Sequence, residues 1–265
     1  MFITNIDYKK DTWIIKTEDG GRYLIACSVA EKYSLSVNDE LSGDLLAENK
    51  AFAVRYGKEK ALGYIAAAAR TESETAKYLK SKHIQPDAAE AVIKFLTDNK
   101  FLNDANYSDL YALSRSEDGQ SRRKIAQKLR KKGIDDTAVS SAEESIDDET
   151  ELKNARKLLE KHNRMKQEVP PVLRRSYLLN KGYAMGFEGS VVSLITEELL
   201  SEDSGGSYEE YYTKLIDKKI TVLHNKKNDY ETAKRKLYSE FLGKGAEMKL
   251  IAERLDAFYT DKNTD

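Results

Sequence analysis

The chain carries two kinds of hydrophobic pattern, which change near residue 57. Before that point, Trp13 to Glu18 and Arg22 to Cys27 are short apolar runs joined by an Asp-Gly-Gly turn at residues 19–21. Glycine at such a turn supplies a positive φ, so the pattern predicts a β-hairpin. We expect another strand near Glu40 to Leu46. The pattern in residues 1–56 thus predicts a small β-rich unit.

From Lys58 onward the apolar residues follow a helical period. Thr71, with Glu74 three residues later, forms a capping box that predicts the start of a helix. Pro86 predicts the first turn of another helix, where proline is favoured. Asp104 is the expected N-cap of a third. The rest of the chain therefore predicts a succession of helices.

One heptapeptide recurs in these helices. Its copies are Tyr78-Leu79-Lys80-Ser81-Lys82-His83-Ile84, Lys128-Leu129-Arg130-Lys131-Lys132-Gly133-Ile134 and Tyr177-Leu178-Leu179-Asn180-Lys181-Gly182-Tyr183. The shared leucines are separated by 129 − 79 = 50 and 178 − 129 = 49 residues. A fixed period of this size is typical of stacked helical units that bury their apolar faces against one another. Gly133 is expected to end its helix in left-handed geometry, and Gly182 to mark the matching helix end.

The patterns predict a mostly α fold: tandem three-helix repeats in an elongated, curved stack, with the small β-rich unit at the N-terminus. The expected ranges are 1–56 for the β-rich cap, then 57–101, 102–146, 147–203 and 204–265 for the four repeats. The fourth repeat rests on its helix pattern more than on sequence identity. Such stacks present long surfaces and usually bind macromolecules.

Charge is strongly segregated, although the net charge is only −1. Residues 120–133 hold seven bases and no acid, and residues 135–151 hold eight acids and no base. The candidate partner-binding or DNA-binding surface, which we call the basic stripe, joins the first segment to bases of the third repeat. Its members are Arg122, Arg123, Lys124, Lys128, Arg130, Lys131, Lys132, Lys153, Arg156, Lys157, Arg174, Arg175 and Lys181. Equivalent positions in a stack line up along one surface, and such cations suit phosphate or an acidic protein.

A second interpretation of the basic stripe stays open. Its charges would then pair with the acidic run that follows, and the helix would simply be solvated. Tyr78, Tyr177 and Tyr183, which lie at repeat positions beside lysines, also have two interpretations. They could stack on nucleic-acid bases, but their helical spacing favours core packing with the hydroxyl at the surface.

The sequence contains no pattern for catalysis or for a cofactor. There is no Gly-x-x-x-x-Gly-Lys phosphate loop. His83, His162 and His224 lie far apart and lack metal-ligand spacing. Cys27, the single cysteine, is expected on a strand as a buried, inert thiol. We therefore expect a protein that is not an enzyme and that holds neither cofactor nor metal.

Asp147, Asp148 and Glu149 could hold a divalent ion, as in a metal-dependent nuclease. Acids at this position more readily favour the N-terminus of the helix that follows. The single cysteine excludes an internal disulfide, and no apolar run approaches the roughly 18 residues that a membrane helix needs. A cytoplasmic protein without a membrane contact is expected.

Four motifs in order resemble the RecX family of recombination regulators. They are Arg70-Thr71-x-x-Glu74, Leu79-x-x-Lys82, Leu102-Asn103-Asp104-x-x-Tyr107 and Leu129-x-x-Lys132-Gly133-Ile134. The resemblance runs from about Lys58 to about Leu200 and continues more weakly beyond. The chain departs from the family pattern at His83, where the later repeats have Gly133 and Gly182. The β-rich N-terminus and the extra C-terminal helices resemble the longer members of that family.

The resemblance implies binding to the RecA recombinase filament on DNA, along its groove. It also implies inhibition of filament growth, strand exchange, ATP hydrolysis and coprotease activity, and so a role in DNA repair, recombination and the SOS response. Weak binding to single- or double-stranded DNA is expected as well. The alternative from the residues alone is a DNA-binding protein that acts without RecA, although a net charge of −1 is unusual for such a protein.

Overall fold

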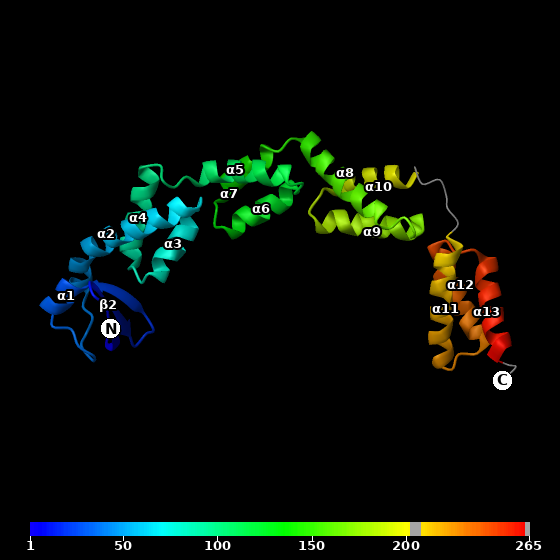
Figure 1. The fold of residues 1–265 in the computed structure, drawn as a ribbon, viewed down its shortest axis with the longest axis horizontal. Helices are drawn as coiled ribbons and strands as arrows, with labels where there is room; N and C mark the ends of the chain where they lie inside the picture. Colours follow the sequence, from blue (N-terminus) through cyan, green and yellow to red (C-terminus); the bar gives the residue numbers. More distant parts are fainter. Residues whose placement is uncertain (202–207, 263–265) are drawn as a thin grey trace. The chain divides into compact units, whose positions relative to one another are not determined.

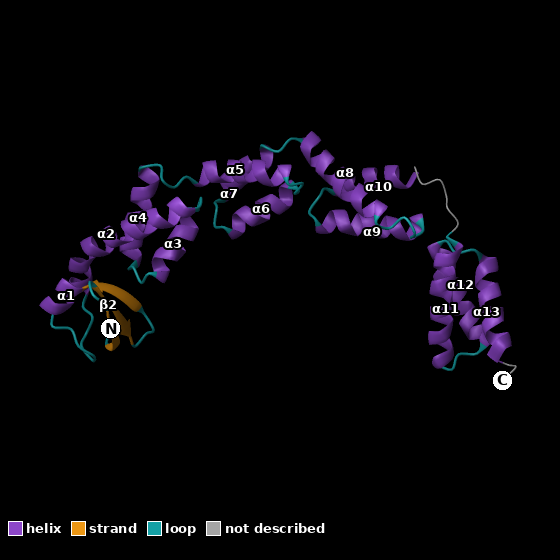
Figure 2. Ribbon diagram, viewed as in Figure 1, coloured by secondary structure: helices purple, strands orange, loops and turns teal. Residues whose placement is uncertain are grey.

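The computed structural model describes residues 1–201 and 208–262, and helices dominate it (Figures 1 and 2). The chain divides into two compact units. The first joins Met1–Arg115 to Ile125–Ile146, and the second joins Ser116–Lys124 to Asp147–Asp265. The predicted fold class, mostly α with a small N-terminal sheet, is confirmed.

The N-terminal sheet has three antiparallel strands in the order β1-β2-β3. They are β1 (Ile3–Tyr8), β2 (Thr12–Thr17) and β3 (Arg22–Ala26), and α1 (Cys27–Lys32) follows at once. The predicted hairpin is β2 and β3, and Gly20 in its turn has φ +81°. Ile15 and Ile25 are fully buried, so one face of the sheet forms a core.

The strand expected near Glu40 to Leu46 is wrong. The backbone of Glu40 pairs with Phe2 as an isolated bridge and not as part of a strand. Ser42 then caps α2 (Gly43–Ala67), because its hydroxyl accepts a hydrogen bond from the Leu45 N–H at 3.3 Å. This 25-residue helix runs through the expected boundary between residues 56 and 57, and the five ranges remain our proposal.

The first two helix triplets each enclose a core of their own. The first consists of α2, α3 (Glu72–Ser81) and α4 (Pro86–Asp98). The second consists of α5 (Asp104–Glu117), α6 (Arg122–Lys131) and α7 (Asp136–Glu144). The Thr71 capping box and Pro86 at the first turn of α4 are confirmed.

Two further triplets follow in the second compact unit. One consists of α8 (Asp148–Arg164), α9 (Pro171–Ala184) and α10 (Gly189–Ser201). The other consists of α11 (Glu209–Asn225), α12 (Tyr230–Phe241) with the short η1 (Leu242–Lys244), and α13 (Met248–Lys262). Tandem three-helix repeats are therefore confirmed, whereas the elongated, curved stack stays a prediction.

The second helix of every triplet ends at a residue with positive φ. These residues are His83 (+62°), Gly133 (+81°), Gly186 (+86°) and Gly245 (+86°). In each case the next N–H bonds back to a carbonyl five residues earlier, as in Ile84 N–H to Leu79 O and Phe187 N–H to Gly182 O. The expected helix end at Gly182 is wrong, since Gly186 is the residue that matches Gly133.

This geometry also corrects the register of the third repeat. The equivalent residues are Leu79, Leu129, Gly182 and Phe241, not Leu178. From the N-cap to the left-handed residue there are 83 − 71 = 12 and 133 − 121 = 12 residues in the first two repeats, but 186 − 170 = 16 in the third. The second helix of the third repeat is one turn longer, because it starts one turn earlier. Leu178, one helical turn before Gly182, therefore matched the leucines of the other repeats in sequence but not in structure.

The left-handed residue is where the second repeat meets the first. A Cβ on Gly133 would lie 2.3 Å from Ser73 Oγ, at the start of α3. Thr71 Oγ1 donates to Lys132 O at 2.9 Å, and the Glu72 N–H donates to Asp104 Oδ1 at 2.9 Å. The start of one second helix is thus bonded to the end of the next.

The same contacts recur between the third repeat and the start of α6. A Cβ on Gly186 would lie 2.8 Å from Ser121 Oγ. Ser121 Oγ donates to Met185 O at 2.7 Å, and the Arg122 N–H donates to Glu151 Oε2 at 3.1 Å. Ser121 thus takes the role of Thr71, and Glu151 takes the role of Asp104, with the same hydrogen-bond donors and acceptors.

The fourth repeat meets α9 by a variant of this contact. Gly245 lies against Val172, where a Cβ would be 3.4 Å from Val172 Cγ2. The cap of α9 is Pro170, which has no hydroxyl, and Tyr212 of α11 instead donates from its hydroxyl to Lys244 O at 2.5 Å.

Asp104 does not cap α5 as expected. Asn103 fills that place, since its Oδ1 accepts from the Asn106 N–H at 2.9 Å. Asp104 instead accepts from the first turn of α3. Burial is the largest effect on its carboxyl and raises the pKa of Asp104, helped by nearby acids and opposed by the hydrogen bond from the Glu72 N–H.

We predict that Gly133→Ala destabilises the protein more than Gly119→Ala. Both glycines have φ near +80°, so each variant meets a backbone cost of about 1–2 kcal/mol. A Cβ at Gly119 meets nothing within 4 Å, whereas one at Gly133 collides with Ser73 and adds about 1 kcal/mol or more. Urea unfolding of the two variants measures the difference. Equal losses would show that the repeats do not meet at Gly133.

We also predict a pH-dependent effect of Asp104→Asn. A folded carboxyl with a raised pKa binds its proton more readily than the unfolded one, so stability falls as pH rises from the ordinary pKa through the raised pKa. Asparagine keeps the acceptor oxygen but cannot ionise. Relative to the parent, the variant should therefore be more stable at about pH 7 than at about pH 4. Urea unfolding at both pH values tests this, with the exposed Asp109→Asn on the same helix as the control. A stability difference from the parent that is the same at both pH values contradicts the role assigned to Asp104.

Candidate functional site

The basic stripe begins on α6, whose apolar seam is narrow. Ile125, Ala126 and Leu129 are fully buried in the core of the second repeat. Every other residue of the helix is charged or polar, so its remaining surface is cationic. This confirms the sequence interpretation of α6 as a basic helix around a thin apolar seam. The binding role of its cations is a separate question.

Several α6 cations are held by acids, as the second interpretation expected. Arg122 Nη2 lies 2.7 Å from Asp148 Oδ1, and Arg130 Nε lies 2.9 Å from Asp136 Oδ1. Both acids belong to the acidic run that follows α6. Lys124 Nζ lies 3.4 Å from Met185 Sδ, close to the junction with the third repeat. Lys128 is half-buried and also has an interaction partner.

Lys132 is a structural residue at the junction of the first two repeats. Its Nζ lies 2.7 Å from Glu74 Oε1 and 5.4 Å from the centre of the Tyr107 ring. The two ionic side chains are only 28% and 22% exposed, so solvent screens them little. Burial opposes the charge of both groups, yet their hydrogen bond raises the pKa of Lys132 and lowers the pKa of Glu74. The capping box and this ion pair share Glu74.

The three arginines of the basic stripe in the third repeat are also engaged. Arg156 Nη2 lies 2.5 Å from Glu198 Oε2, and Arg175 Nε lies 2.6 Å from Glu197 Oε1. Arg174 is only 2% exposed and its Nη2 lies 3.3 Å from the Tyr208 hydroxyl. Arg174 is therefore part of the protein interior, and its position on an exposed stripe is wrong.

Four cations of the stripe are exposed and form no ion pair within residues 1–201 and 208–262. They are Arg123 and Lys131 on α6, and Lys153 and Lys157 on α8. Arg123 and Lys131 are eight positions apart on α6, and Lys153 and Lys157 are four positions apart on α8. The two residues of each helix therefore share a face. We call these four residues the open cations. Lys181 is half-buried and lies near His162, whose pKa is lowered by burial and then by this lysine.

The other candidate groups have local structural roles. His83 ends α3, and His162 Nδ1 lies 2.8 Å from the Tyr177 hydroxyl. Asp147 caps α8 through the Thr150 N–H at 2.6 Å, as the helix-start interpretation of the three acids expected. In the described part of the chain, no group of three or more His, Cys, Asp and Glu residues could hold a metal ion.

Cys27 differs from its expected place. It is the first residue of α1 rather than a strand residue, and it is partly exposed. Its Sγ lies 3.1 Å from Glu31 Oε1, and this hydrogen bond is the main cause of a raised pKa of the Cys27 thiol. A raised thiol pKa disfavours the reactive thiolate.

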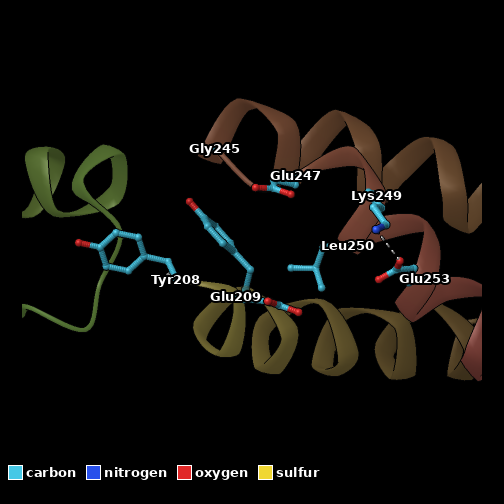
Figure 3. A pocket seen from close by; sticks show the side chains of 8 residues that line it. Tyr208, Glu209, Gly245, Glu247, Lys249, Leu250 and Glu253 are labelled. Atoms are coloured by element: carbon cyan, nitrogen blue, oxygen red, sulfur yellow. Dashed lines mark ion pairs between the residues drawn. The ribbon is translucent and has the colours of Figure 1, made fainter. Parts of the chain in front are cut away.

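A hollow of 320 Å³ lies in the fourth repeat, and Figure 3 shows the side chains that line it. It is lined by Tyr208, Glu209, Tyr212, Gly245, Glu247, Lys249, Leu250 and Glu253. Lys249 Nζ lies 3.7 Å from Glu253 Oε1, the pair drawn with a dashed line. This lining brings together no nucleophile with a base and an orienting group. The hollow lies beside the Gly245 junction, where Tyr212 makes its structural hydrogen bond.

No helix in residues 1–201 and 208–262 is both long and apolar enough to span a membrane.

Family models match two segments of the chain. Residues 58–96 match "RecX, first three-helix domain", and residues 103–142 match "RecX, second three-helix domain".

Proteins named "Regulatory protein RecX" are similar over most of the chain. One from Streptococcus equi subsp. zooepidemicus (strain MGCS10565) is 27% identical over 267 residues, covering 98% of this chain and 100% of the relative. One from Listeria welshimeri is 27% identical over 235 residues, covering 82% and 85%.

Two solved structures are also similar. "Crystal structure of regulatory protein RecX" has a TM-score of 0.54 at 25% identity and covers 74% of this chain and 98% of that one. "Crystal structure of RecX from Lactobacillus salivarius" has the same score and identity, covering 56% and 97%.

We predict that Lys132→Ala and Lys131→Ala differ in stability although the lysines are neighbours. Removing Lys132 leaves Glu74 partly buried without its ion pair and should cost about 1–2 kcal/mol. Lys131 is exposed, so its loss should change the free energy of unfolding by less than about 0.5 kcal/mol. Urea unfolding at neutral pH compares the two. Equal stabilities would mean that the Lys132–Glu74 pair does not join the repeats.

Proposed function

Because this chain belongs to the RecX family of regulatory proteins, we propose that it binds filaments of the RecA recombinase on DNA and inhibits them. The inhibited activities are strand exchange, ATP hydrolysis and coprotease activity, and the outcome is control of DNA repair and recombination. The protein acts by binding, without a reaction or cofactor of its own.

The observation that carries the proposal is the set of open cations on α6 and α8. Arg123, Lys131, Lys153 and Lys157 are exposed and contribute no ion pair to the described fold. Most other cations of the basic stripe pair with acids or bond within the protein. The open cations are therefore free to pair with carboxylates of a protein surface or with DNA phosphates.

A repeat protein suits a filament as its partner. Successive repeats present similar helices, and a filament presents similar subunits at regular intervals. Several weak contacts that form together give strong overall binding, because each contact after the first is intramolecular. Contacts of exposed charges are individually weak, so binding through them should depend on all four and on ionic strength.

The test replaces the four open cations by alanine and measures the DNA-dependent ATPase rate of RecA. We expect the quadruple variant to need about tenfold more protein, or higher, for half-inhibition, because each exposed contact supplies about 0.2–1 kcal/mol. Its circular dichroism and unfolding should match those of the parent, since alanine favours helix and the substitutions break no ion pair among residues 1–201 and 208–262.

The matched control replaces Lys10, Lys94, Lys214 and Lys249, four exposed lysines outside the basic stripe, and so has the same net charge. It should inhibit like the parent. If both quadruple variants inhibit RecA as the parent does, the basic stripe is not the binding surface. If the parent neither inhibits nor co-sediments with filaments, but binds DNA alone with a steep salt dependence, it acts on nucleic acid without RecA.

A further inference from the structure

An apolar groove lies between the N-terminal sheet and the first helical repeat. Its volume is 640 Å³, and all its lining residues belong to the first compact unit. One wall is the end of the β2–β3 turn and the start of β3. The other wall is formed by α3, α4 and the segment that connects them. In Figure 2 the orange sheet lies next to these first helices.

The floor of the groove is apolar apart from one amide. Ile84 is buried, and Ala89 and Ile93 lie one turn apart on α4. Gln85 is 94% buried, as it is only 6% exposed, and it also lines the groove. Its Nε2 lies 3.5 Å from Leu24 O, whereas its Oε1 has no hydrogen-bond donor within the described structure. A buried acceptor without a donor favours a ligand that supplies an N–H.

The same wall offers an open strand edge. The Leu24 N–H of β3 donates away from the sheet to His83 O at 2.8 Å, and Leu24 O accepts from Asn49 Nδ2 at 2.8 Å. Residues two apart in a strand direct their backbone groups to the same side. Arg22 therefore directs its N–H and C=O to the same outer edge, where no described residue bonds to them. At this edge the backbone groups of Leu24 already have hydrogen-bond partners, whereas those of Arg22 remain available to a ligand.

The rim of the groove is more basic than acidic. Arg22 and Lys80 line it, and both are exposed without an ion pair in the described part of the chain. Glu90 is the single acid of the lining. Unpaired cations beside an apolar floor complement a partner that is apolar and acidic.

We infer that this groove binds an extended, acidic peptide segment of a partner protein by strand addition to β3 at Arg22. The peptide backbone bonds to the N–H and C=O of Arg22, and an apolar side chain enters the groove over Ile84, Ala89 and Ile93. Acidic side chains on either side pair with Arg22 and Lys80. Strand addition of this kind takes affinity from main-chain hydrogen bonds and specificity from side-chain pockets. The groove is separate from the basic stripe, and the inference does not rest on the proposed function.

The test uses a fluorescent peptide of sequence Ser-Glu-Leu-Glu-Val-Glu-Ser, titrated with the full-length protein. Its alternation of apolar and acidic residues suits an extended strand with one face in the groove. We expect saturable binding, with slowed hydrogen exchange at the Arg22 amide. A peptide methylated at its central backbone nitrogens, or one with lysine in place of glutamate, should bind about tenfold more weakly or worse, equivalent to about 1.4 kcal/mol.

Two protein variants address the groove directly. Ala89→Trp fills it and should abolish binding of the peptide, and Lys80→Glu reverses a rim charge and should weaken binding. Lys77→Glu, an exposed site on the same helix that does not line the groove, is the matched control and should bind like the parent. Circular dichroism verifies folding of each variant, and Lys80→Glu keeps the test valid if Ala89→Trp misfolds.

Three outcomes would overturn the inference: no binding of the acidic peptide, equal binding of the methylated peptide, or equal binding by Lys80→Glu and Lys77→Glu. Displacement of the peptide by an oligothymidylate would assign the groove to nucleic acid instead. Dissociation of a dimer on Ala89→Trp substitution would assign it to a second copy of the chain.

Discussion

The structure depends on one backbone constraint, the left-handed residue that ends the second helix of each repeat. At Gly133 and Gly186 this residue brings its chain onto the start of the preceding second helix, so closely that a Cβ would collide. A hydroxyl at that start bonds to the carbonyl just before the glycine, and a carboxylate bonds to the next N–H. Polar groups at two helix ends, which would otherwise need water, thereby satisfy one another. At the first repeat His83 takes this position and bonds to β3, so the sheet occupies the place of a preceding repeat.

This packing also divides the cations into two classes. Lys132 and Arg122 lie at the junctions, paired with Glu74 and Asp148. The Lys132–Glu74 pair is shielded from solvent and stabilises the contact between repeats, whereas Asp148 is exposed. The open cations lie on the exposed sides of α6 and α8. The pattern of acidic partners distinguishes these two classes within one basic sequence segment. The ion-pairing interpretation of the basic stripe is true of the paired residues, whereas the binding interpretation of the open cations stays a prediction.

The sequence predicted the helical period, the capping box at Thr71, the left-handed Gly133 and the β2–β3 hairpin, because each is set by local residues. It missed what depends on distant contacts. In sequence Leu178 aligns with Leu129, but the extra turn at the start of α9 places Gly186 in register with Gly133. Asp104 resembles a helix cap but bonds to another repeat. The burial of Arg174 and the groove between Arg22 and Lys80 depend on elements far apart in the chain, so no local pattern predicted them.

A reconstruction of the protein bound to a RecA filament on single-stranded DNA tests the central claim most directly. At a resolution that shows side chains, we predict that α6 and α8 face the filament, with Arg123, Lys131, Lys153 and Lys157 within ion-pair distance of RecA carboxylates or DNA phosphates. The junction residues Lys132 and Glu74 should remain paired inside the protein. Contact made only through other helices, with α6 and α8 turned to solvent, would contradict it.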